Sequence, residues 1–181
     1  MTWKGYFQKM RGTTSSPPGV SLGEIAWSWF GAFLGIAAVA YAHYGWLGPT
    51  DLVLIVGSCG ASAVLIYGAV RSPLAQPRNL VGGHLLSALV GVACQQALGP
   101  WPWLAAAAAV ATSIALMHAT RTLHPPGGAT ALIAVIGGER IHALGFLYVL
   151  MPVAAGVAIL LFVALAVNNL APHRRYPEFW W

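Results

Sequence analysis

Two short polar segments interrupt an otherwise apolar chain, and both place arginine near a glycine pair. The first reads SPLAQPRNLVGGH (residues 72–84), and the second reads RTLHPPGGATAL (residues 121–132). Arg71, Arg78 and Arg121 lie in or beside them, whereas all four acidic residues lie elsewhere in the chain. Cations without a nearby carboxylate favour an anionic ligand. One such contact at about 4 Å contributes about 4 kcal/mol at an effective dielectric near 20, before desolvation.

The glycine pairs are expected near helix starts, where backbone N–H groups are unpaired and carry about half a positive charge. Glycine lets a small anion approach such a backbone closely. His124 is predicted to gate the ligand or donate to it, and its titration near neutral pH would couple flux to protons. The predicted ligand-binding residues are Arg71, Arg78, Asn79, Gly82, Gly83, His84, Arg121, His124, Pro125, Pro126, Gly127, Gly128 and Thr130.

A plainer interpretation stays open for several of these residues. Arginines at helix ends are favoured by the helix dipole and reach the lipid headgroups without binding any ligand. His84 on an apolar helix fits a hydrogen-bonded core histidine equally well.

Catalytic and metal sites are not expected. The chain has no HxxxH, CxxC or HExxH pattern, no carboxylate pair inside an apolar run, and no nucleophile with a clear base. We therefore predict no catalytic residue, no metal, no cofactor and no enzymatic activity. Two alternatives remain: a membrane-embedded enzyme acting on a lipid or quinone head group, and a non-transporting scaffold or sensor.

The composition places these segments in a membrane protein. Of the 181 residues, 58% are hydrophobic and only 7% are charged, against roughly 25% charged in soluble domains. The basic residues are scattered despite the net charge of +5, so nucleic acid is not an expected partner. Five apolar runs are long enough for a membrane helix: residues 25–42, 52–70, 80–98, 101–119 and 141–167. We predict an all-α, polytopic transmembrane bundle.

Lysine and arginine positions predict the orientation. A sixth apolar run, residues 127–137, covers only half a bilayer. If all six segments cross in order, one side holds eight of the nine basic residues and the other holds Arg140 alone. The rival topology has five spans. We expect residues 1–24 to be a cytoplasmic segment, 25–170 the membrane domain and 171–181 a cytoplasmic tail, in the bacterial inner membrane without a cleaved signal peptide.

The His-Pro-Pro stretch is predicted to re-enter the membrane. The preceding span ends near Ala119, and the short helix starts near Gly127 at about mid-depth. The chain must therefore climb about 14 Å, which six extended residues can do because they reach roughly 20 Å. We predict that the prolines hold this stretch extended. Irregular backbone at that depth requires protein or a watery cavity beside it.

Three further patterns bear on packing. Residues 64–92 and 114–138 share the order helix, arginine, proline loop, glycine pair and helix, which suggests an internal repeat. Gly31 and Gly35 share one helix face, which favours close packing inside the bundle or in a dimer. Pro152 is predicted to kink the last span.

The two polar segments resemble the signature segments of the HPP family of integral membrane proteins, in sequence and in order. The resemblance implies a membrane domain usually described with four spans. It also implies transport of nitrite or another small monovalent anion, because plastid and cyanobacterial relatives are implicated in nitrite transport. We expect this anion and membrane lipids as partners, and a homodimer or higher homo-oligomer because the bundle is small for a pore of its own.

Overall fold

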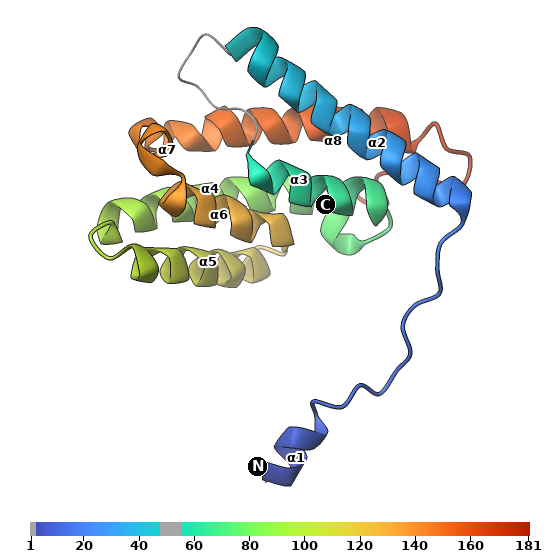
Figure 1. Cartoon of the computed structure of the whole chain (residues 1–181), viewed down its shortest axis with the longest axis horizontal. Helices are drawn as coiled ribbons and strands as arrows, with labels where there is room; N and C mark the ends of the chain where they lie inside the picture. The colour runs from blue at the N-terminus through green and yellow to red at the C-terminus, as the bar shows by residue number, and fades with distance from the viewer. Residues whose placement is uncertain (1–2, 48–55) are drawn as a thin grey trace.

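A computed structural model describes residues 3–47 and 56–181, and this part of the chain is helical, with a long connection over residues 9–21 and shorter ones elsewhere (Figure 1). The predicted all-α class is therefore confirmed. The α-helices are α1 Trp3–Gln8, α2 Leu22–Tyr41, α3 Gly57–Ala63, α4 Pro77–Leu98, α5 Pro102–Ala119, α6 Pro125–Ile136, α7 Gly138–Leu144 and α8 Ala155–Asn168. Shorter π- or 3₁₀-helical segments are η1 Ala42–Leu47, η2 Val64–Gly68, η3 Pro73–Ala75 and η4 Val149–Ala154.

Within the described residues, four helical segments are long and apolar enough to cross a membrane: Leu22–Gly45, Pro77–Leu98, Pro102–Ala119 and Val149–Asn168. Two shorter apolar helices, Gly57–Gly68 and Pro125–Ile136, lie between them in the chain. Each short helix rises about 18 Å, against about 30 Å for the hydrocarbon core. The full-length helix predicted for residues 52–70 is wrong in its described part, because Val56 is extended and the helix starts at Gly57. Residues 52–55 lie outside the described residues.

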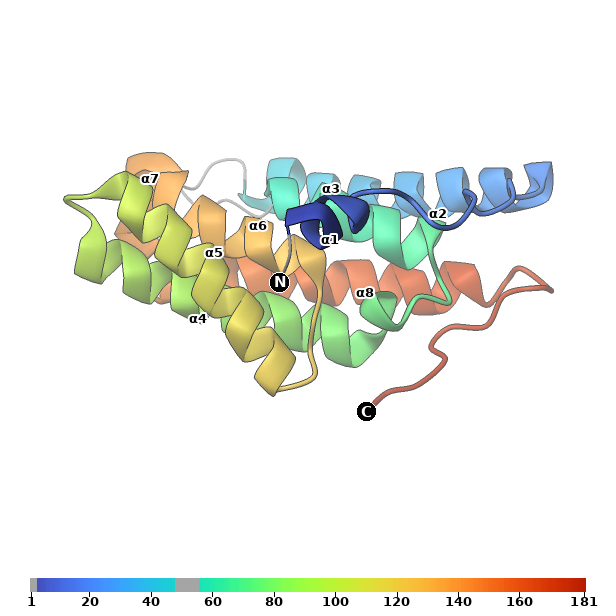
Figure 2. The same ribbon diagram turned by 90° about the horizontal axis from the view of Figure 1, so that it is seen from below.

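Successive segments run in alternating directions, as the prediction of six segments in order requires (Figure 2). The connection 69–76, the connection 120–124 and the C-terminal residues lie at the end of the bundle where α2 begins. Hydrogen bonds join all three: His124 Nδ1 lies 2.8 Å from the Leu74 oxygen, and the Tyr176 hydroxyl donates to the Ala75 oxygen at 2.8 Å. We call this the arginine end, because these segments and the start of α4 carry Arg71, Arg78, Arg121, Arg174 and Arg175.

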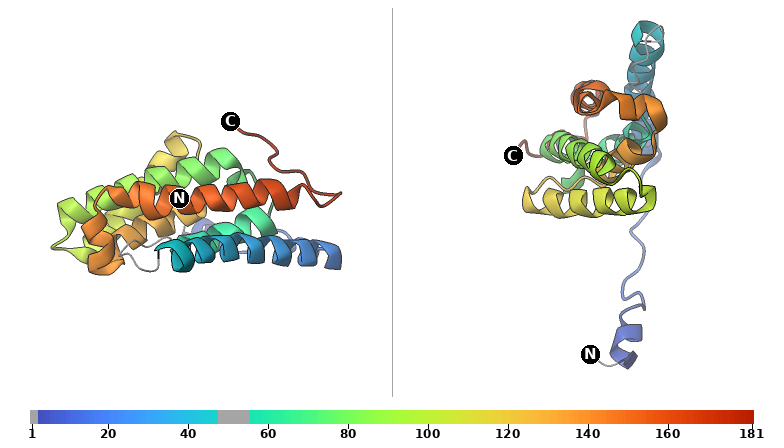
Figure 3. Two further views of the ribbon diagram at one scale, coloured as in Figure 1. Left: turned by 90° about the horizontal axis from the view of Figure 1, so that it is seen from above. Right: turned by 90° about the vertical axis from the view of Figure 1, so that its left-hand side faces the viewer.

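Two groups of helices pack side by side in the bundle (Figure 3): α4 with α5 and α6, and α2 with α8. Gly31 and Gly35 of α2 make room for Tyr67, since a Cβ atom at Gly31 would lie 2.7 Å from Tyr67 Cδ1. The Tyr67 hydroxyl donates to the Leu160 oxygen at 3.1 Å. The glycine pair therefore serves packing inside the bundle.

The last span is kinked at Pro152, as predicted. Met151 leaves the helical conformation (φ −129°, ψ 117°) directly before this proline.

Beyond α8, the C-terminal segment folds back on the bundle. Tyr176 is buried, and the Glu178 N–H donates to Gln76 Oε1 at 2.8 Å. Burial raises the pKa of the Tyr176 phenol above its usual value. Residues 171–178 are thus part of the packed domain.

Candidate functional site

The chain reverses sharply after α5 through a backbone conformation that favours glycine. The Thr122 N–H donates to the Met117 oxygen at 2.8 Å, and the Arg121 N–H donates to the His118 oxygen at 3.2 Å. This pair of bonds is the Schellman motif. Arg121 occupies its left-handed position with φ 57°, where a side chain costs about 1–2 kcal/mol. The turn sends the chain back along α4 and leaves the Arg121 side chain exposed.

The His-Pro-Pro stretch is extended only at its histidine. His124 is the N-cap of α6 (φ −141°, ψ 103°), and Pro125 and Pro126 are the first two helical residues. The predicted extended prolines and the helix start at Gly127 are therefore wrong. Proline suits the first turn of a helix because its φ is preset and the N–H that it lacks would be unpaired there.

The same geometry leaves few backbone donors at the start of α6. Pro125 and Pro126 have no N–H, and the Gly127 N–H donates to the His124 oxygen at 2.8 Å. The other predicted helix start, near Gly82 and Gly83, is also wrong, because α4 begins at Pro77. The N–H of Gly83 lies beyond the four unpaired N–H groups of a helix start.

Residues 120–124 lie along the first two turns of α4. Arg78 Nη2 donates to the Thr120 oxygen at 2.8 Å, and Asn79 Nδ2 donates to the Leu123 oxygen at 2.9 Å. A Cβ atom at Gly82 would lie 2.6 Å from Thr122 Cγ2. The two polar segments predicted from the sequence therefore meet, held by side-chain donors on backbone carbonyls.

The glycine pairs allow α6 to approach α4. A Cβ atom at Gly83 would lie 2.6 Å from His124 Cβ, and one at Gly127 would lie 2.8 Å from Ser87 Oγ. Gly128 is less crowded, with Val110 Cγ1 at 3.8 Å as its nearest neighbour. Three of these four glycines thus face protein atoms directly.

A buried polar cluster forms where α3, α4 and α6 meet. Ser62 Oγ lies 2.6 Å from His84 Nε2 and 2.9 Å from His124 Nε2. His84 Nδ1 lies 2.7 Å from Thr130 Oγ1, and the two imidazole centroids are 5.0 Å apart. We call these four residues the histidine cluster; each is at most 1% exposed. The sequence predicted three of its members as ligand-binding residues but did not predict that they converge.

Ser62 and Tyr148 are the site residues that sequence reasoning missed. Ser62 lies on short helix α3, one turn after Ser58, in a run that otherwise looks like lipid-facing sequence. Tyr148 precedes η4, and its hydroxyl donates to the Thr130 oxygen at 2.9 Å. The Ser58 and Ser62 spacing of four was the available signal, because it places two hydroxyls on one face of an apolar helix.

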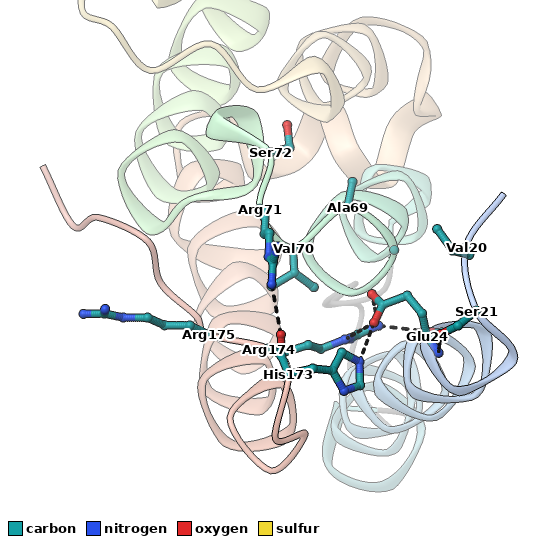
Figure 4. Close-up of a pocket in the computed structure, with 11 residues that line it drawn as sticks. Val20, Ser21, Glu24, Ala69, Val70, Arg71, Ser72, His173, Arg174 and Arg175 are labelled. Carbon is teal, nitrogen blue, oxygen red and sulfur yellow. Dashed lines mark hydrogen bonds and ion pairs between the residues drawn. The ribbon is translucent and has the colours of Figure 1, made fainter. Parts of the chain in front are cut away.

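A second polar feature is a pocket of about 420 Å³ at the arginine end (Figure 4). Arg71 lines it and donates through Nη2 to the His173 oxygen at 3.1 Å. Arg174 is paired with Glu24, with Nη2 at 2.7 Å from Oε1, whereas the Arg175 side chain points away from this pair. His173 Nε2 also lies 2.8 Å from Glu24 Oε2. The residues that line this pocket therefore include three arginines and one carboxylate, and the carboxylate is paired with Arg174.

The predicted site residues thus fall into separate groups. The histidine cluster is buried, while Arg71 and Arg121 are exposed at the arginine end. Within the described residues, no group of three His, Cys, Asp or Glu side chains is placed to hold a metal ion. The cluster offers two imidazoles and two hydroxyls, which can donate to an anion or exchange a proton.

Comparisons with known proteins identify the domain. The family model for the HPP transmembrane region matches residues 17–177. Two Dictyostelium discoideum proteins, each named only as a transmembrane protein, are 48% identical over 179 residues and 46% identical over 181 residues. Each match covers 97% of this chain, but the chain spans only 57% and 63% of those proteins. No solved structure matches. With its two polar segments side by side in a helical membrane domain, the chain belongs to the HPP family of integral membrane proteins.

Proposed function

We propose that this protein carries a small monovalent anion, nitrite in the first instance, across the membrane. The observation that carries the proposal is the fully buried histidine cluster, which has no acidic side chain among its hydrogen-bond partners in the described part of the chain. Burying a polar cluster in an apolar bundle costs free energy. Such clusters inside membrane domains commonly mark ion or proton pathways.

The arginine end supplies the attraction for the anion. Arg71, Arg78 and Arg121 have no carboxylate partner among the interactions of the described residues. Arg71 and Arg78 each donate to a backbone carbonyl, which leaves their charge uncompensated. We propose that these guanidinium groups concentrate the anion at the mouth of the bundle. We also propose that this end faces the cytoplasm; the bacterial inner membrane stays a prediction.

The short helices supply the interior path in this proposal. We propose that the chain re-enters the membrane at residues 120–124, so that α3 and α6 each cover about half of the bilayer. Side-chain donors of His84, His124 and Thr130 then serve the anion. They replace the backbone amides of Gly83 and Gly128, because Gly83 lies inside α4 and two prolines begin α6. A homodimer or higher oligomer remains part of this proposal.

The test is nitrite uptake into liposomes that contain the purified full chain. We expect uptake above that of protein-free vesicles, reduced at least about tenfold in His84→Gln and His124→Gln. The matched control is His118→Gln, since His118 is exposed on α5. The proposal fails if a panel of nitrite, nitrate, chloride and formate shows no uptake, or if both cluster variants transport like the wild type. Chemical cross-linking in the same membranes tests the oligomer.

One observation favours a second candidate function, that of a membrane-embedded enzyme. Ser62 Oγ lies within hydrogen-bond distance of two imidazoles, which is the arrangement of an activated nucleophile. Ser62 is completely buried, however, and a lipid or quinone head group is far bulkier than the nitrite ion that the proposed path must admit. We expect a serine-reactive fluorophosphonate to leave Ser62 unlabelled in membranes. Labelling abolished by Ser62→Ala would favour the enzyme. Absence of thermal stabilisation by the anion panel would favour a scaffold.

A further inference from the structure

The hydrogen bonds of the histidine cluster determine which of its atoms carry a hydrogen. The Leu74 oxygen only accepts, so His124 Nδ1, 2.8 Å away, must carry a hydrogen. Ser62 has one hydroxyl hydrogen for two Nε2 neighbours. Thr130 also has one, with two acceptors in reach: His84 Nδ1 at 2.7 Å and the Pro126 oxygen at 3.3 Å.

With both imidazoles neutral, one arrangement satisfies every member of the cluster. Thr130 donates to His84 Nδ1, and His84 Nε2–H donates to Ser62 Oγ. Ser62 donates to His124 Nε2, and His124 Nδ1–H donates to the Leu74 oxygen. The two histidines are therefore opposite tautomers. Any other neutral arrangement leaves a buried nitrogen or hydrogen unpaired, which costs about 1–3 kcal/mol.

One added proton creates two arrangements that are both fully bonded. In both, His84 Nδ1–H donates to Thr130, and Thr130 turns its hydroxyl hydrogen to the Pro126 oxygen. If His84 holds the charge, its Nε2–H donates to Ser62, and Ser62 donates to His124. If His124 holds the charge, these last two bonds reverse. The two forms interconvert when one hydrogen enters and another leaves Ser62 Oγ.

We propose that Ser62 relays one proton between His84 and His124, and that this proton accompanies each transported anion. The inference rests on the proposed function, because it assigns the coupling of the same site. A doubly protonated imidazole beside the anion leaves the interior of the bundle without net charge, which removes most of the cost of burying the anion. Transport is then electroneutral proton–anion symport.

The titratable side chains packed around the cluster are a thiol and phenols, which already carry their own proton, so the added proton stays on the imidazoles. On α3 the titratable neighbour is Cys59, and beyond α6 it is Tyr148, which donates to the Thr130 oxygen. Tyr67 and Tyr176 donate to the Leu160 and Ala75 oxygens. On α4 the nearest cation is Arg78, which is held on Thr120 at the arginine end, and on α5 His118 is exposed.

The coupling is tested in liposomes that contain the full chain, a nitrite gradient and an internal pH dye, with the membrane potential clamped by potassium and valinomycin. Protein-free vesicles give the background from nitrous acid diffusion. We expect about one proton per nitrite and uptake that does not change with potential. Ser62→Ala should lower proton-coupled uptake at least about tenfold. Ser58→Ala is the matched control, because Ser58 is buried one turn away and has no hydrogen-bond partner among the described residues.

Histidine NMR keeps the inference testable if Ser62→Ala does not fold. In ¹⁵N-histidine-labelled wild type, we expect His84 protonated on Nε2 and His124 on Nδ1, assigned with His84→Gln and His124→Gln. On acidification, both signals should shift together as they share one proton. Identical tautomers or two independent titrations would overturn the relay. Nitrite uptake driven by potential, without proton movement, would overturn the coupling alone, whereas no anion uptake at all would overturn the proposed function as well.

Discussion

Gly127 of α6 faces Gly83 of α4 so closely that a Cβ atom at Gly127 would lie 2.9 Å from the Gly83 carbonyl oxygen. The same atom would lie 2.8 Å from Ser87 Oγ. This contact fixes the distance between the helices that carry His84 and Thr130. The glycine pair of the HPP segment is thus first a packing device, on which the histidine cluster depends.

Gly127→Ala should separate α4 from α6 and destabilise the domain by about 1–3 kcal/mol, the usual cost of overpacking. Gly128→Ala is the matched control, since its Cβ would meet only Val110 Cγ1, at 3.8 Å. The measurement is thermal unfolding of both variants in detergent. Equal melting temperatures would show that the approach of the two helices is not tight.

Arg121 permits a test that separates backbone from charge. Its left-handed φ of 57° favours glycine, so Arg121→Gly should stabilise the fold by about 1 kcal/mol. Arg121→Gln keeps the backbone strain and removes the same charge. If Arg121 attracts the anion, both variants should lower nitrite uptake at low salt, and the loss should shrink at high salt. Loss of uptake in Arg121→Gln but not in Arg121→Gly would contradict a role for the charge, because both variants lack it.

Arg174 should be far more important for stability than its neighbour Arg175. Its side chain is only 3% exposed, and besides pairing with Glu24 it donates to Asn168 Oδ1 at 3.0 Å and to Ser28 Oγ at 2.8 Å. Removing one partner of a buried pair costs about 3–5 kcal/mol; Glu24 is 23% exposed, so we expect Arg174→Ala to cost about 2–3 kcal/mol. The Arg175→Ala variant should unfold at the same temperature as the wild type. Equal melting temperatures for Arg174→Ala and Arg175→Ala would contradict a structural role for the Arg174 contacts.

Most of the architecture follows from the lengths of the apolar runs and from the basic residues between them. The apolar runs predict the four long helices, and the alternation of basic residues predicts that both polar loops and the C-terminal segment share one end. The length of the 127–137 run correctly indicates a short helix. These features depend on local sequence and on the solvent, so one sequence is enough to infer them.

The errors come from residues whose role depends on tertiary contacts. Pro125 and Pro126 suggest an extended chain until His124 is seen to cap a helix. Arg121 gives no sign of a left-handed turn, since glycine is the usual residue there. Ser62 shares an apolar run with Ser58, and only the packing of α6 against both α3 and α4 brings Ser62 to the two histidines. Convergence of residues 62, 84 and 124 is a property of the fold.

Asn79 offers a last prediction, because it joins the two polar segments directly. Its Nδ2 donates to the Leu123 oxygen at 2.9 Å, one residue before His124. Asn79→Leu removes this donor, leaves a carbonyl less well paired, and should destabilise the domain by about 1 kcal/mol. Asn79→Asp also removes the donor and adds a negative charge beside Arg78. If the arginine end guides an anion inward, Asn79→Asp should lower nitrite uptake well below that of Asn79→Leu. Thermal unfolding and nitrite uptake, measured on both variants, separate the two effects, and equal uptake would argue against an anion path beside Asn79.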